Sequence, residues 1–132
     1  MKKLEIIIRP SMFDTVKDAL TDMGIHGLNY VEIKGFGRQR GHTEVYRGTT
    51  MQVDCLPKIR VEVVLHDDML ETVLNAVVSI SRTGQVGDGK IFISDVMDAI
   101  RIRTGEEGPE AISDRLDDLK IVNKIAAEAA DE

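Results

Sequence analysis

Hydrophobic and polar residues alternate in four segments of the chain and recur at helical spacing in two others. Leu4, Ile6 and Ile8 predict a first strand that ends at Pro10. The same alternation predicts strands over 29–34, 59–65 and 91–96. Two helices are predicted by apolar side chains every three or four positions: Phe13, Val16, Leu20 and Met23 in the first, and Leu70, Val73, Leu74, Val77 and Val78 in the second.

Both predicted helices carry a start signal. Ser11 stands three residues before Asp14, and Asp68 three residues before Glu71, which is the spacing of a capping box. We therefore expect side-chain caps at both helix starts. Gly24 predicts the end of the first helix.

The predicted order is strand, helix, strand, long loop, strand, helix, strand. Two βαβ halves of similar length favour an α+β fold of the ferredoxin-like βαββαβ type, with both helices on one face of a four-stranded antiparallel sheet. Ile7 and Val64 fall on the other face of their strands. A second subunit is expected to cover that face.

The long loop, from Gly35 to Lys58, is the most informative segment. Structureless loops beyond about 12–15 residues are uncommon unless they are functional or disordered. Four glycines and several charged side chains suit an exposed segment. We predict that this loop is the functional surface and that the remainder is its platform.

Beyond Arg103 the chain changes character. Residues 104–109 form a linker rich in turn residues, and the sequence after it predicts an amphipathic acidic helix. Such a helix packs on its own core or on a neighbouring subunit, or it binds a separate partner. Its apolar face comprises Leu116, Leu119, Val122, Ile125, Ala126 and Ala129. We expect a domain over 1–112 and a C-terminal helical extension over 113–132.

Charge and composition exclude several functions. The net charge of −6 lies wholly in residues 106–132, since residues 1–105 hold 14 basic and 14 acidic side chains. A general nucleic-acid binder needs a basic face, and one for single strands needs aromatic platforms, yet the chain has no Trp, two Tyr and three Phe. No nucleic-acid partner is expected.

The N-terminus and the cysteine content predict the compartment. No signal peptide is recognisable, and no apolar run approaches the roughly 18 residues of a membrane span. The single Cys55 excludes an internal disulfide and a cysteine cage for a metal, and it suits a reducing compartment. We expect a soluble, cytoplasmic protein with no direct membrane insertion.

A second informative segment, Thr83–Ile93, contains glycines at 84, 87 and 89 and then Lys90. Glycines let successive backbone N–H groups converge on an anion. Arg101 and Arg103 stand two residues apart and, if extended, point to the same side, as suits bidentate contact with phosphate. The glycine-rich turn alone also fits an ordinary hairpin, but the combination favours a polyphosphate site.

These segments resemble the PII nitrogen-regulatory signalling family along residues 1–112. The resemblance rests on 34–41 (KGFGRQRG), 46–48 (YRG), 54–58 (DCLPK), 83–93 (TGQVGDGKIFI) and 101–105 (RIRTG). It implies a homotrimer with nucleotide sites in the clefts between subunits. It also implies a sensor of nitrogen, carbon and energy status, not an enzyme.

The ligands that the resemblance implies are ATP or ADP, 2-oxoglutarate and Mg²⁺. It assigns to the nucleotide Ile7, Asn29, Gly35, Gly37, Arg38, Glu62, Val64, Gly87, Asp88, Gly89, Lys90, Arg101 and Arg103. It assigns 2-oxoglutarate to Gln39, Lys58 and Gly87, and Mg²⁺ to Gln39. Taken alone, Gln39 and Lys58 read as solvated loop residues.

The resemblance implies that residues 37–55 dock on a target protein, either an ammonium transporter or a nitrogen-assimilation enzyme. Where the target is a transporter, this protein is expected to be recruited to the membrane. Two alternatives stay open. The first is a PII-like sensor of another small molecule. The second is a small ferredoxin-fold phosphotransferase, whose only candidate histidines are His26, His42 and His66.

The chain departs from the family pattern in three places. Asn29 stands where the family often has a threonine near the adenine. Met51 replaces the tyrosine that many bacterial relatives uridylylate, so no uridylylation is expected. Thr49 stands where some relatives carry a phosphorylated serine, which is weak support for phosphorylation at Thr49. Residues 113–132 extend past the point where family members commonly stop.

Overall fold

The computed structural model describes residues 1–36, 42–46, 49–53 and 55–113. The strands are β1 (Lys2–Ile8), β2 (Leu28–Phe36), β3 (His42–Tyr46), β4 (Thr49–Val53), β5 (Cys55–Leu65) and β6 (Lys90–Asp95). The helices are α1 (Phe13–Asp22) and α2 (Leu70–Ser81), with short 3-10 helices η1 (Pro10–Met12), η2 (Asp67–Met69) and η3 (Gly108–Ile112).

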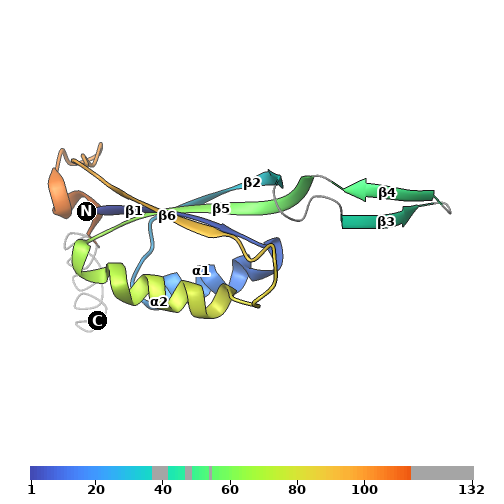
Figure 1. Ribbon diagram of the computed structural model, residues 1–132. Coiled ribbons are helices and arrows are strands. Elements are labelled where there is room, and N and C mark those ends of the chain that lie inside the picture. Colours follow the sequence, from blue (N-terminus) through green and yellow to red (C-terminus); the bar gives the residue numbers. More distant parts are fainter. Residues whose placement is uncertain (37–41, 47–48, 54, 114–132) are drawn as a thin grey trace, which may run out of the picture.

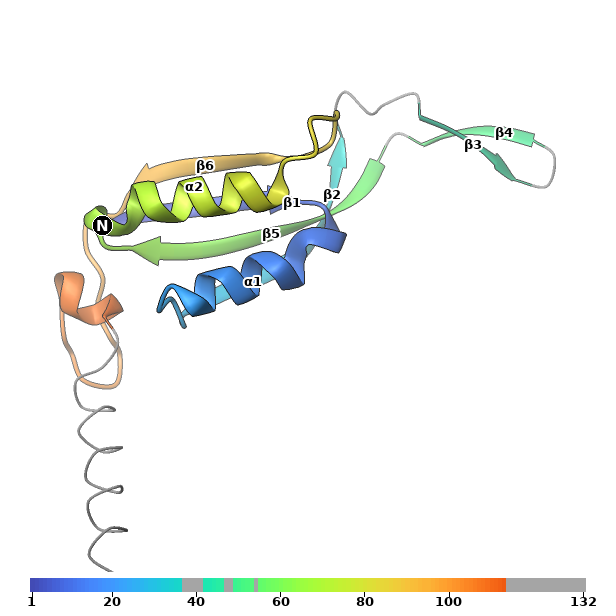
Figure 2. The same ribbon diagram turned by 90° about the horizontal axis from the view of Figure 1, so that it is seen from below.

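The main sheet has the strand order β2-β5-β1-β6, and each neighbouring pair is antiparallel. Both helices lie on one face of this sheet (Figures 1 and 2). This arrangement confirms the predicted ferredoxin-like α+β fold.

The core lies between the sheet and the two helices. From Leu4 to Ile8 in β1 and from Ile59 to Leu65 in β5, every second side chain is buried. Leu4 faces Val63 and Ile6 faces Val61 across the two strands. The helices contribute their predicted apolar stripes, of which Val16, Leu20, Val73 and Val77 are fully buried. The alternation read from the sequence is therefore the pattern that burial imposes.

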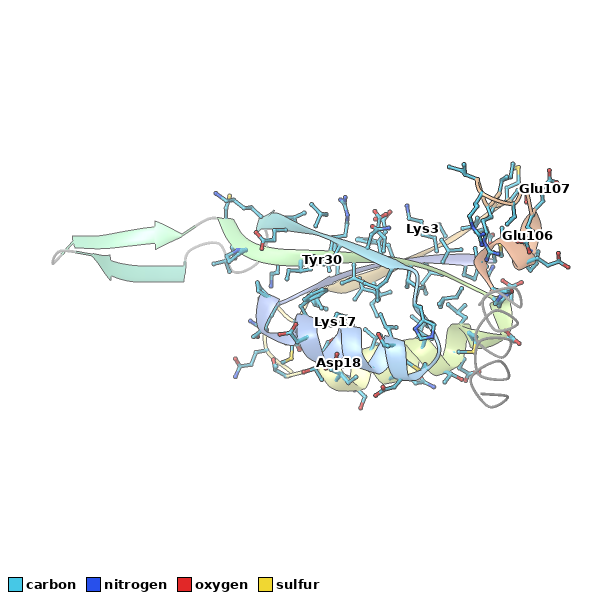
Figure 3. All side chains as sticks on the ribbon, turned by 180° about the vertical axis from the view of Figure 1, so that it is seen from behind. Lys3, Lys17, Asp18, Tyr30, Glu106 and Glu107 are labelled. Atoms are coloured by element: carbon cyan, nitrogen blue, oxygen red, sulfur yellow. The ribbon has the colours of Figure 1, made fainter. Side chains whose placement is uncertain are left out.

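The opposite face of the sheet carries no helix in the described part of the chain (Figure 1). Strand alternation places Ile7, Val64 and Phe92 there, and Phe92 is 53% exposed. Figure 3 shows Lys3 on this open face and Tyr30 on the helix side, where its ring lies 4.4 Å from that of Phe13. Coverage of the open face by a second subunit stays a prediction.

The predicted structureless loop is partly strand, so that prediction is wrong for the described residues. β2 and β5 extend until Phe36 pairs with Cys55, and β3 and β4 form a separate antiparallel ribbon beyond them (Figure 1). Pro57 lies within β5, although proline has no backbone N–H to donate to a neighbouring strand. It is tolerated because pairing with β1 ends at Ile59, so β5 is an edge strand on that side.

The predicted capping boxes are also wrong. The N-cap residues are Met12 for α1 and Met69 for α2, and neither makes a side-chain cap bond. Each helix follows a 3-10 turn, which places Ser11 and Asp68 inside the turn. The turns are closed by backbone bonds such as Met12 N–H to Arg9 O, at 3.0 Å.

The segment after β6 turns back on itself. Ile100 bridges Glu107, and Gly105 N–H donates to Arg101 O at 2.7 Å, so Arg101 begins a turn and Arg103 lies within it. The prediction of an extended segment is therefore wrong at these two arginines. No helix in the described part of the chain is long and apolar enough to cross a membrane.

Candidate functional site

The glycine-rich turn between α2 and β6 is held in shape by Asp88. Its carboxylate accepts hydrogen bonds from the backbone N–H groups of Thr83 (2.8 Å) and Gly84 (2.9 Å). It also accepts one from the Thr83 hydroxyl. The backbone of the predicted anion-binding turn is therefore fixed by a carboxylate within the turn itself.

These contacts keep Asp88 ionised. The Thr83 hydroxyl, the two backbone N–H groups and the Arg9 guanidinium hold the pKa of the Asp88 carboxyl well below its usual range. A negative carboxylate that is already bonded in this way repels phosphate. The Asp88 side chain therefore anchors the turn. The predicted contact of Asp88 with phosphate stays a prediction that concerns its backbone N–H.

The substitution Asp88→Asn tests this anchor through pH. Because the native pKa is depressed, the carboxylate stabilises the native state above about pH 4, and this contribution is lost as the pH falls through the native pKa. We expect Asp88→Asn to lower the melting temperature near pH 7 and to weaken its decline in acid. Thermal unfolding from about pH 7 to about pH 2 measures both.

The control is Asp95→Asn, since the Asp95 side chain is 81% exposed and pairs with Lys2 at the far end of β6. It should leave the acid decline as steep as in the wild type. An equally steep decline in Asp88→Asn would contradict the anchoring role.

Two cations hold the carbonyl groups of the same turn. Arg9 Nη2 donates to Val86 O at 3.0 Å and to Asp88 Oδ1 at 3.2 Å. Lys58 Nζ donates to Gly87 O. Carbonyls of two successive residues are thus taken by cations, which places positive charge beside the turn. Arg9 was not among the predicted site residues, because in the sequence it is only a basic residue at the end of the first strand.

Lys58 lies inside β5 and is only 8% exposed. Its individual interpretation as a solvated loop residue is therefore wrong. Burial lowers the pKa of the Lys58 ammonium, and the nearby Arg9 charge lowers it further. The structure brings Lys58 together with Gly87, its predicted partner in 2-oxoglutarate binding.

Gly89 is required where the turn meets β1. Its φ is +103°, and a Cβ at this position would lie 1.8 Å from the carbonyl oxygen of Ile7. Gly35 is also crowded, since a Cβ there would lie 3.2 Å from Cγ of Lys58. Backbone contact with β1 therefore requires glycine at position 89, whereas at position 35 the crowding comes from the Lys58 side chain.

A cavity of about 420 Å³ adjoins this turn, between α2 and the start of β6. Its lining is largely apolar and includes Ile7. Asp88, Gly89 and Lys90 line the same cavity. Four residues that were predicted for the nucleotide therefore meet at one opening.

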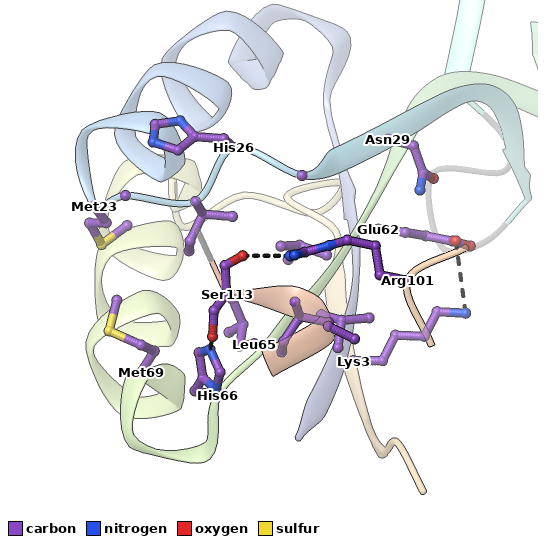
Figure 4. Close-up of a pocket in the computed structure, with 17 residues that line it drawn as sticks. Lys3, Met23, His26, Asn29, Glu62, Leu65, His66, Met69, Arg101 and Ser113 are labelled. Carbon is purple, nitrogen blue, oxygen red and sulfur yellow. Dashed lines mark hydrogen bonds and ion pairs between the residues drawn. The ribbon is translucent and has the colours of Figure 1, made fainter. Parts of the chain in front are cut away.

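The second group of predicted residues lines a larger open cleft of about 810 Å³ (Figure 4). Asn29, Glu62, Val64 and Arg101 all line it. Glu62 is paired with the ammonium of Lys3 at 3.8 Å, drawn as a dashed line in Figure 4. The cleft therefore has both an acidic and a basic side chain within it.

Arg101 is the most engaged side chain of this cleft. Its guanidinium pairs with Glu106 at 2.8 Å and donates to Ser113 O at 2.8 Å. The Thr104 hydroxyl and then the Arg101 charge lower the pKa of Glu106. Arg103, by contrast, is exposed. The two arginines are therefore not presented together in this chain.

The two cavities share no lining residue among those that the structure describes. One group lies at the turn: Ile7, Gly35, Lys58, Gly87, Asp88, Gly89 and Lys90. The other lies in the larger cleft, with Asn29, Glu62, Val64 and Arg101. Within the part of the chain that the structure describes, the two groups of predicted nucleotide residues therefore line separate cavities.

Several predicted residues lie outside this geometry. Gly37, Arg38 and Gln39 fall outside the described residues. Thr49 and Met51 lie in β4, and their predicted modification states stay predictions. Within the described residues, no three His, Cys, Asp or Glu side chains form a group that could hold a metal ion.

Two of the three histidines that a phosphotransferase would have used, His26 and His66, line the larger cleft. Figure 4 shows His66 beside Ser113, whose hydroxyl lies 3.0 Å from Nε2. His42 lies in β3. These positions do not place His26 or His66 in the cavity at the glycine-rich turn.

Comparison with known proteins gives a consistent result. The family model described as Nitrogen regulatory protein P-II matches residues 1–106. Two proteins named "Nitrogen regulatory protein P-II" are similar to this chain over 112 residues. The one from Cereibacter sphaeroides is 60% identical to this chain, and the one from Rhodobacter capsulatus is 54% identical. "Nitrogen regulatory protein P-II 1" from Escherichia coli K12 is 51% identical over the same length. Each alignment covers 85% of this chain and all of the relative.

Proposed function

This chain belongs to the nitrogen regulatory protein P-II family, and on that premise we propose that it is a sensor that binds ATP or ADP competitively and 2-oxoglutarate together with Mg-ATP. The ligand state would set the conformation of residues 37–55. These residues would dock on an ammonium transporter or a nitrogen-assimilation enzyme in the cytoplasm, with recruitment to the membrane in the first case.

The observation that carries this proposal is the anchored turn before β6. Asp88 fixes its amide side, Arg9 and Lys58 fix its carbonyl side, and Gly89 seats it on β1. A turn held from both sides keeps its geometry before a ligand arrives, which reduces the ordering cost of binding. Lys90, directly after it, supplies a charged donor for phosphate.

The separation of the two residue groups supports a homotrimer. A nucleotide that contacts both the turn and Arg101 needs the turn of one chain beside the larger cleft of another. The open sheet face carries Phe92, which is 53% exposed, beside ion-paired side chains such as Lys3 and Glu62, and it offers both apolar and charged contacts to such an assembly. A site shared between subunits would also link ligand occupancy to the state of the whole assembly.

The signal itself would be a shift in population between loop conformations. Each ligand biases the loop by its differential affinity for the two states. Met51 has a thioether in place of a hydroxyl, so it cannot accept a nucleotidyl group. The ligands alone would then carry the signal.

Mg²⁺ fits this scheme as a companion of the nucleotide. It prefers hard oxygen ligands, and it commonly binds through substrate phosphates together with a small number of protein groups. Gln39 would supply a carbonyl oxygen to it. When bound, the ion would neutralise negative charge on the nucleotide phosphates and the 2-oxoacid. Lys58 would pair with a carboxylate of 2-oxoglutarate.

A sensor of another small molecule remains the alternative within the binding class. The buried Lys58 cation beside Gly87 favours the dicarboxylate, because a buried charge needs an anionic or strongly polar partner. A phosphotransferase is disfavoured by the position of His26 and His66 away from the glycine-rich turn. A phosphate-release assay separates the classes, since a sensor should hydrolyse ATP negligibly.

Titration calorimetry with ATP and Mg²⁺, with and without 2-oxoglutarate, tests the proposal directly. We expect ATP to bind, and 2-oxoglutarate to bind only when ATP and Mg²⁺ are present. Lys90→Ala should weaken ATP roughly ten- to a hundredfold, because a hydrogen bond to a charged group contributes about 1.5–3 kcal/mol. Unchanged ATP affinity in this variant would remove Lys90 from the phosphate site.

A further inference from the structure

The C-terminal end of the described chain lies inside the larger cleft. Ala111, Ile112 and Ser113 line it together with Asn29 and the other predicted nucleotide residues. The Ser113 carbonyl accepts a hydrogen bond from Arg101 Nη2 at 2.8 Å (Figure 4). The Ser113 hydroxyl lies 3.0 Å from His66 Nε2 and donates to Pro109 O at 2.9 Å. The segment is therefore held in place by three polar contacts.

A phosphate and the Ser113 carbonyl compete for the same end of Arg101. Nη1 already binds Glu106 and Nη2 binds Ser113 O, and the side chain is only 14% exposed. Bidentate contact with a phosphate needs two neighbouring N–H groups that face the ligand. A phosphate that takes the Nη1 and Nη2 pair therefore displaces the Ser113 carbonyl.

We infer that Ala111–Ser113 is a strap that competes with the nucleotide phosphates for Arg101, so that nucleotide binding releases the strap. This inference rests on the proposed function. The match to the family model ends at residue 106, so the strap lies outside the segment that this model covers. Coupling is reciprocal: if the nucleotide loosens the strap, the strap weakens nucleotide binding by the same factor.

The substitution Ser113→Ala in the full chain tests the strap. It removes the two hydroxyl contacts that hold Ser113 and leaves Arg101 untouched. We expect ATP with Mg²⁺ to bind about two- to tenfold more tightly, the range that one lost neutral hydrogen bond in the competing state allows. The matched control is Ser79→Ala on the exposed side of α2, which should leave the affinity unchanged.

Hydrogen exchange of the wild type gives an independent reading. Peptides that cover residues 108–113 should exchange faster when ATP is bound, because the Ser113 N–H to Glu110 O bond is freed with the strap. Slower or unchanged exchange with ATP bound would overturn the strap, as would unchanged affinity in Ser113→Ala. Absence of ATP binding in every variant would overturn the proposed function itself, and the strap with it.

Discussion

Replacing Gly89 by alanine is expected to weaken ATP binding by at least about a hundredfold, because a displaced turn loses hydrogen bonds to the charged phosphates that contribute about 1.5–3 kcal/mol each. The new Cβ would lie 1.8 Å from the carbonyl oxygen of Ile7, which belongs to the backbone of β1 and cannot rotate away. Relief requires the turn to move off the sheet. Gly87 and Lys90, on either side, would move with it.

Gly84→Ala is the matched control for this prediction. Gly84 also has a positive φ, +84°, but its Cβ would meet no atom within 4 Å. Both variants therefore carry the backbone strain of about 1–3 kcal/mol, and only Gly89→Ala carries the overlap. Calorimetric titration should show ATP affinity within a few fold of wild type in Gly84→Ala. Equal losses of ATP affinity in the two variants would show that backbone strain, and not the contact of Gly89 with β1, determines the affinity.

The elements of the fold were predictable because burial imposes a period on the sequence. The Leu4, Ile6 and Ile8 alternation and the α2 stripe with Val73 and Val77 correspond to fully or nearly fully buried positions. Such positions tolerate little change without loss of packing, so the pattern is strong. Helix starts were predicted less well, since the 3-10 turns η1 and η2 satisfy the first backbone groups without a side chain.

The supports of the site were not predictable from local pattern. Arg9 and Asp88 are 79 residues apart in sequence, and their contact depends on β1 pairing with β6. The sequence pattern placed Lys58 at the end of the long loop, whereas the register extends β5 through this position and the lysine is buried. The glycine-rich turn is visible as a sequence motif. Its contacts with Arg9 and Lys58 depend on how the strands pair.

Lys58→Met is expected to abolish 2-oxoglutarate binding while ATP binding falls far less. Lys58 is a buried cation, and loss of one partner from a buried charge pair costs about 3–5 kcal/mol, which corresponds to at least about a hundredfold in affinity. Methionine keeps a similar length and apolar stem, so the space in β5 stays filled. Calorimetric titration of 2-oxoglutarate in the presence of ATP and Mg²⁺ measures the loss.

The stability of this variant separates a functional role from a structural one. Burial and the Arg9 charge lower the pKa of Lys58, so folding disfavours its charged form, and this cost is present at every pH below the native pKa. Removing the charge should therefore leave the melting temperature near pH 7 unchanged or raised, although Gly87 O loses its donor. Lys17→Met on α1, with a side chain 45% exposed, should change neither binding nor stability. Unaltered 2-oxoglutarate affinity in Lys58→Met would remove the lysine from the site. If 2-oxoglutarate binds the wild type without nucleotide and Mg²⁺, the proposed role of Mg²⁺ in 2-oxoglutarate binding is wrong.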